Sequence, residues 1–161
     1  MARYMQKGTT KFYFVPTIAG ADLIPTPTEI GAGDYIGADI ADVSGFNFEN
    51  DPISTPDMDS TFDSSIPGTD KADNSSLTFY EHVGLAANTV KTLLAKGTTG
   101  YIVVFPYGIA GANPAANDEC DVWPVQVASN SRAYSAGNEA SKFTVMFSIT
   151  AEPALDVEVT A

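Results

Sequence analysis

Residues 142–150 read KFTVMFSIT and carry the strongest secondary-structure signal in the chain. From Phe143 to Ile149 every second side chain is large and apolar, and the side chains between them are mostly polar. A period of two predicts a β-strand with one buried and one exposed face. We therefore expect Phe143, Val145 and Phe147 in the core and a polar face outside.

Other stretches rich in aromatic and β-branched residues predict further strands. Apolar residues on both faces of residues 101–107 indicate a central strand, whereas Trp123, Val125 and Val127 mark one buried face of another. Gly45 is a candidate β-bulge. The expected strands are residues 12–15, 40–49, 77–80, 101–107 and 123–127, with a last extended piece at 155–160.

One helix is predicted over residues 86–97. Apolar side chains at positions 86, 90, 93 and 94 share one helical face, and Gly97 stands where a helix would end. The order of strands, one helix and more strands predicts a mainly β fold. We expect a two-sheet β sandwich or barrel with one packed α-helix and long loops, in a single domain over residues 1–161. Any unpaired sheet edges would be available to an assembly.

Three segments are expected to lack regular structure. Residues 1–9 are predicted to form a flexible arm that carries Arg3 and Lys7, and residues 19–38 a long Gly- and Pro-rich connection with at most a short strand in it. Residues 50–74 hold three prolines and six aspartates without hydrophobic periodicity. A loop this long is usually functional or disordered, so we predict a long acidic loop that becomes ordered only on assembly.

Charge and composition exclude several classes of protein. Acidic residues outnumber basic ones 20 to 8, for a net charge of -12. This argues against a general nucleic-acid binder and against adhesion to an anionic membrane. No apolar run approaches the ~20 residues that span a bilayer. The polar residues 1–10 do not read as a signal peptide, and we expect synthesis in a bacterial cytoplasm.

The residues that usually carry chemistry are few and isolated. His82 is the sole histidine and Cys120 the sole cysteine, so no intrachain disulfide and no four-ligand zinc site can form. Acidic neighbours disfavour a Cys120 thiolate, and no nucleophile motif accompanies His82. We predict no catalytic residue and no cofactor.

An acidic cluster resembles the start of a calcium loop. Asp57, Asp59 and Asp63 have suitable spacing, but Phe62 and Gly68 stand where an EF-hand requires Gly and Glu. We therefore predict no metal site of this kind, with a looser calcium site as the alternative.

Taken in order, these segments resemble the major tail tube proteins of long-tailed, lambda-like bacteriophages. The resemblance covers most of the chain. Its segments are residues 7–10 with the aromatic strand after them, 46–49 and 77–80 as a long hairpin, 86–97 with 101–107, and the closing stretch 143–153. It implies a structural virion protein of the tail, without enzymatic activity. It also implies hexameric rings that stack into a tube, through which DNA passes without specific binding. The implied partners are other copies of the chain and the tape measure, tail terminator and distal tail proteins.

This resemblance turns polar strand faces and charged segments into site candidates. We expect the lumen to be acidic and polar, against the competing view that the charge lies mainly outside and serves solubility. The basic arm is expected to reach a neighbouring subunit's acidic loop. The candidates for lining the lumen are Asp39, Asp42, Asn47, Glu49, Thr78, Thr144, Ser148 and Thr150, and those for contacts between subunits are Arg3, Lys7, Lys11, Asp57, Asp59 and Asp63.

Two other functions remain open from the sequence. One is the inner tube protein of a contractile tail or of a bacterial injection or secretion system. The other is a secreted β-sandwich that serves as a binding or surface-layer domain.

Overall fold

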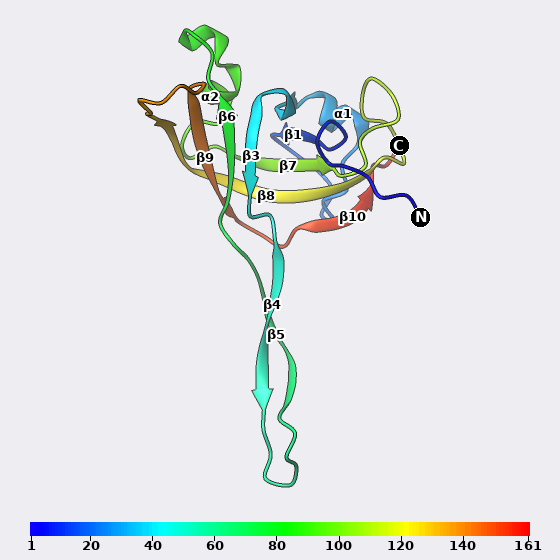
Figure 1. The fold of residues 1–161 in the computed structure, drawn as a ribbon. Helices are drawn as coiled ribbons and strands as arrows, with labels where there is room; N and C mark the ends of the chain where they lie inside the picture. The colour runs from blue at the N-terminus through cyan, green and yellow to red at the C-terminus, as the bar shows by residue number, and fades with distance from the viewer.

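Ten strands dominate the computed structural model, which describes residues 1–161 (Figure 1). Eight of them form one strongly bent sheet, and two form a separate ribbon. The predicted mainly β, two-sheet fold is confirmed. The strands are β1 (Lys11–Val15), β2 (Asp34–Tyr35), β3 (Ile40–Ser44), β4 (Phe48–Thr55), β5 (Ser64–Ala72), β6 (Ser75–Tyr80), β7 (Thr99–Phe105), β8 (Glu119–Ala133), β9 (Lys142–Ile149) and β10 (Ala154–Glu158).

Strand β8 belongs to both layers of the bent sheet. Its first part pairs with β7 and β10, and its second part pairs with β9 as far as Ala133↔Lys142. The two parts overlap at Val125 and Gln126, which pair with both β7 and β9. A register shift follows between Val127 and Ser129, and such a bulge bends a strand. The first layer is therefore β2-β1-β7-β8 with β10, and the second is β8-β9-β6-β3.

The larger hydrophobic cluster lies between these layers. Phe14 and Ile102 from the first layer meet Leu77, Phe79 and the β9 side chains from the second. The rings of Phe79 and Phe143 stack with centroids 5.2 Å apart. The three β9 residues predicted to be in the core are all buried, which confirms the alternation as the core signal: Phe143, Val145 and Phe147.

A second hydrophobic cluster covers the other face of β1, β7 and β8. Because Ile102 lies in the first cluster and Val103 in the second, β7 is buried on both faces, as predicted. Helix α1 (Pro27–Gly31) covers this side through Ile30. Residues 19–38 were expected to form a connection that holds a short strand; β2 is that strand, but the helix was not predicted. Thr26 caps the helix reciprocally with Glu29, a signal that the sequence contains.

The predicted helix at residues 86–97 is much shorter in the structure. Helix α2 (Thr89–Leu93) follows the 3₁₀ turn η2 (Leu85–Ala87). Asn88 accounts for the difference, because its side chain donates to the His82 and Gly84 carbonyls and accepts the His82 N–H. Such bonds compete with helix backbone. Of the predicted apolar face, Leu94 is fully buried and Val90 and Leu93 pack against the first cluster, whereas Ala86 is exposed. Neither helix is long and apolar enough to cross a membrane.

Residues 50–74 form most of a long β-hairpin, so the prediction of a structureless loop is wrong. Strands β4 and β5 pair from Phe48↔Ala72 to Thr55↔Ser64, and the ribbon projects away from the body (Figure 1). Both faces of the ribbon are exposed, so no hydrophobic alternation marks it. Polar contacts hold the strands together instead, including Asn50 Nδ2 to Asp70 Oδ1 at 2.6 Å.

An ion cluster joins the ends of the second layer to α2. The Glu81 carboxylate accepts from Arg132 of β8 at 2.8 Å, from Ser141 at 3.2 Å and from Lys91 of α2 at 3.4 Å. The hydrogen bonds from Arg132, with smaller help from Lys91, hold the pKa of Glu81 below its ordinary value. The cluster therefore favours the ionised carboxylate in the folded state.

We predict that Glu81→Gln makes stability less dependent on pH in acid. The folded-state pKa of Glu81 is lowered, so its contribution is present above the unfolded value of about 4.5 and is lost as pH falls through the folded value. Urea unfolding followed from pH 6 to pH 3 should show a smaller loss for the variant than for the wild type. Glu139→Gln removes the same charge from an exposed carboxylate 3.8 Å from Lys142 and should keep the wild-type slope. Equal slopes for all three proteins would contradict the assignment.

Candidate assembly surfaces

The outer side of the second layer is a continuous polar face. Asp42, Thr78, Thr144 and Ser131 are neighbours across β3, β6, β9 and β8. The hydroxyls of Thr78 and Thr144 lie 3.2 Å apart. Further side chains of this face are Ser44, Ser76, Tyr80, Gln126, Ser129, Lys142, Met146 and Ser148.

This face carries little charge. Its charged side chains are Asp42 on β3 and Lys142 at the start of β9. Lys142 lies 3.8 Å from Glu139 and 5.7 Å from the centre of the Tyr80 ring, so part of its charge is already balanced. Hydroxyl groups make up most of the remaining surface.

Four of the eight lumen candidates therefore share one face, namely Asp42, Thr78, Thr144 and Ser148. The other four lie elsewhere. Asp39 is in the 3₁₀ turn η1 (Gly37–Asp39), with Oδ1 3.1 Å from His82 Nε2. Thr150 follows the end of β9 and donates its N–H to the Pro124 carbonyl. Asn47 and Glu49 lie at the base of the hairpin, beyond a break in the strand.

Both edges of the second layer are unpaired. Strand β3 pairs with β6 on one side and with no strand on the other. At the opposite edge, residues 129–133 of β8 pair with β9 alone, because β7 ends its pairing at Gln126. Exposed strand edges present free N–H and C=O groups that can pair with another chain.

The hairpin leaves this layer at Gly45 and Phe46, a junction that the sequence marked only as a bulge at Gly45. Both residues have positive φ, +85° and +57°. The Phe46 N–H donates to the buried Ser75 Oγ at 2.8 Å, and its ring packs edge-on against Trp123 with centroids 5.6 Å apart. The junction thus ends the alternation of β3 and anchors the hairpin base in the core.

The hairpin tip holds the acidic candidates together. Asp57 Oδ1 accepts the N–H groups of Asp59 and Ser60, each at 2.9 Å, and so shapes the tip. Asp59 and Asp63 are exposed. Met58 and Phe62, which sequence reasoning did not single out, are exposed beside them at 104% and 75%.

The basic candidates lie on the body of the molecule. Arg3 and Lys7 are exposed, and the N–H groups of Thr9 and Thr10 donate to the Gln6 carbonyl in a turn. Lys11 begins β1, with its ammonium 5.9 Å from the Tyr35 ring. Figure 1 shows the N-terminus far from the hairpin tip. Contact between arm and tip would therefore need two copies of the chain.

Comparison with known proteins decides the family. The model of the phage tail tube protein family matches residues 1–161. The chain belongs to this family. It is therefore a structural component of the virion tail, and the resemblance read from the sequence is confirmed.

The solved structure of the SPP1 tail tube, from solid-state NMR and electron cryomicroscopy, is similar to this member of the family. The two align with a TM-score of 0.52 at 13% identity, over 95% of this chain and 77% of that chain. At this identity the likeness shows a shared fold. No curated protein sequence matches the chain.

The side chains of this tail tube protein that could take part in catalysis or metal binding do not lie together. Burial, followed by the charges of Asp121 and Asp118, raises the pKa of the Cys120 thiol to about 12. His82 lies at the surface against Asp39. No three His, Cys, Asp or Glu residues are grouped as metal ligands would be.

We predict that Gly45→Ala destabilises the hairpin junction. A methyl group there would lie 2.8 Å from the Ser75 Cα, in a backbone conformation with φ +85°. Strain of this kind costs about 1–3 kcal/mol. Gly31→Ala is the matched control, because nothing lies within 4 Å of its added methyl group and its φ is not in the left-handed region. Denaturant unfolding that gives the same midpoint for both variants would contradict the role of Gly45.

Proposed function

We propose that six copies of the chain close into a ring by pairing β3 of one subunit with the free edge of β8 of the next. The polar face then lines the bore, and stacked rings form a conduit for DNA ejection. The observation that carries this proposal is the pair of unpaired edges on one layer whose outer face is hydroxyl-rich.

Strand direction supports this closure. Neighbouring strands of β3-β6-β9-β8 are antiparallel, so β3 and β8 run in opposite directions. Rotation about a ring axis keeps the axial direction of each strand, so the β3 of a neighbour runs opposite to β8. The new pair is therefore antiparallel, like every pair already in the sheet. Closure of this kind also removes both edges, which lowers the risk of unspecific aggregation.

The hairpin supports stacking. Strand β3 leads into β4, and β5 leads back into β6, so the ribbon continues roughly along the strands of the second layer (Figure 1). If those strands follow the bore, the hairpin extends beyond its own ring toward another. A two-stranded ribbon is marginally stable alone, so contact with a neighbouring ring would stabilise it. This retains the predicted assembly role of residues 50–74.

The lining that we propose is mainly neutral. Each subunit contributes Asp42 and Lys142 as the charged groups of the polar face, so most of the net charge of -12 lies elsewhere. This favours the view that much of the acidity serves solubility and contacts. A hydroxyl surface offers phosphates few cations to bind, so DNA can pass without being held. We propose no catalytic role, and the tube ends would meet the other tail proteins.

We predict that the purified chain assembles in a concentration-dependent way. Mass photometry over a dilution series should show monomers giving way to hexamers, and electron micrographs of concentrated protein should show tubes. The assay is run with and without a tail initiator complex as a seed, so that slow nucleation is not mistaken for an inability to assemble. A strict monomer at high concentration, with no polymer in either condition, would contradict the proposal.

We predict that Asp42→Lys permits assembly but slows DNA ejection. The change adds two positive units per subunit, or 6 × 2 = 12 per ring, to a surface that now carries few cations. Raising the salt concentration should relieve the delay, because phosphate contacts weaken with salt. Asp22→Lys makes the same change in an exposed loop outside the polar face and should leave ejection unchanged. Normal ejection by both variants would show that Asp42 does not line the bore.

A further inference from the structure

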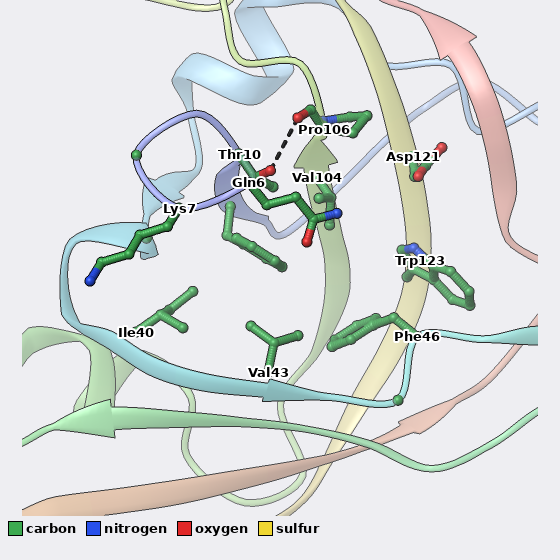
Figure 2. Close-up of a pocket in the computed structure, with 14 residues that line it drawn as sticks. Gln6, Lys7, Thr10, Ile40, Val43, Phe46, Val104, Pro106, Asp121 and Trp123 are labelled. Carbon is green, nitrogen blue, oxygen red and sulfur yellow. Dashed lines mark hydrogen bonds between the residues drawn. The ribbon is translucent and has the colours of Figure 1, made fainter. Parts of the chain in front are cut away.

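A cleft of about 490 Å³ opens between β3 and the first layer, beside the N-terminal turn (Figure 2). Its apolar walls include Ile40, Val43 and Phe46 on one side and Val104 and Trp123 on the other. Figure 2 shows the first three pointing toward the space between the layers. Val43 is 41% exposed even though it lies on the inner face of β3. The interior of the fold is therefore open to solvent along this edge.

The two ends of the cleft differ in charge. Lys7 stands at the end formed by the N-terminal turn, whereas the Gln6 side chain extends toward Val104 and Asp121 lies near Trp123 at the other end (Figure 2). Residues 1–11 carry Arg3, Lys7 and Lys11 and no acid. An acidic apolar segment would therefore be attracted to the Lys7 end and repelled from the end that holds Asp121.

The hairpin tip has the chemistry that this cleft requires. Residues 56–63 contain three aspartates, no basic residue and two exposed apolar side chains, Met58 and Phe62. A partner that buries such large exposed apolar side chains gains binding free energy from them. Since a cavity of about 150 Å³ holds benzene, the cleft has room for the Phe62 ring with the Met58 side chain.

From this complementarity we infer that the hairpin tip of one copy docks into the cleft of another, with Phe62 against Phe46 and Val43 and with Asp63 facing Lys7. The inference rests on the proposed stacking of rings and names the surface that receives the hairpin. It also makes the basic arm and the acidic tip parts of one contact. The hairpin tip lies far from β3 and from the N-terminal segment (Figure 1), whose residues line the cleft. The contact therefore joins two copies.

The contact explains two features that a lone subunit leaves without a role. Met58 and Phe62 are kept at the end of a long ribbon, where they contribute nothing to either core cluster. Val43 lies on the inner face of its layer but remains exposed to solvent. Docking buries all three and excludes water from around the Lys7–Asp63 pair, which strengthens the attraction.

A photo-crosslinking amino acid in place of Phe62 tests the contact in assembled tubes. We expect cross-links between chains, mapped by mass spectrometry to residues 6–12 or 40–46. Cross-links that reach only other segments, such as the exposed loop at Val83 and Leu85, would overturn the inference and leave the tube itself standing. If the wild-type chain forms no tube, the proposed function fails and this inference fails with it.

A charge-swap series provides the second readout. Lys7→Glu and Asp63→Lys should each raise the concentration needed for tubes, and the double variant should restore it toward the wild-type value. Lys96→Glu changes the charge of an exposed lysine outside the cleft and should assemble like the wild type. Phe62→Ser should raise the threshold at least tenfold, because an apolar anchor is lost. Tubes from Phe62→Ser at the wild-type threshold, or no rescue by the double variant, would overturn the inference.

Discussion

Hydrogen bonding along the fifteen residues of β8 is the interaction on which the rest of the structure depends. Strands β7, β9 and β10 all pair with it. Its bulge after Val127 turns one sheet into two layers, and its side chains enter both hydrophobic clusters. Because the pairing of β7 with β8 ends at Gln126, residues 129–133 of β8 have one edge that pairs with no strand. The bend that creates the core therefore also creates one of the surfaces that we assign to assembly.

Much of the fold was predictable where burial is one-sided or complete. The alternation in residues 142–150 and the apolar run at 101–107 identified β9 and the central β7, because packing imposes those patterns. The resemblance implied a long hairpin in this region, but its strands β4 and β5 were not predicted from the residues. Neither face of these strands is buried, so no hydrophobic pattern is imposed on them. The helix at 86–97 was predicted too long because the Asn88 side chain competes for backbone groups, which apolar periodicity does not register.

The same presence or absence of a buried strand face explains which site residues the sequence placed correctly. Thr78, Thr144 and Ser148 were correctly placed on one face. In a regular strand, the residues between the buried side chains all point to the opposite, polar face. Asn47 and Glu49 were placed by extending that alternation through Gly45 and Phe46, where two positive φ angles end it. Asp39 directly precedes the expected strand 40–49 and lies in a 3₁₀ turn instead of on the polar strand face. The cleft depends on how two layers diverge, and no local sequence pattern encodes that distance.

A single geometrical arrangement accounts for the free edges, the hydroxyl face and the projecting ribbon of this tail tube protein. The edges close the ring, the face lines the bore, and the ribbon reaches another ring. A helical reconstruction of assembled tubes by electron cryomicroscopy tests this arrangement most directly. We expect main-chain pairing between residues 40–44 of one subunit and 129–133 of the next, with Thr78 and Thr144 facing the bore. A map in which these edges remain apart, or in which the hydroxyl face lies on the outside of the tube, would contradict it.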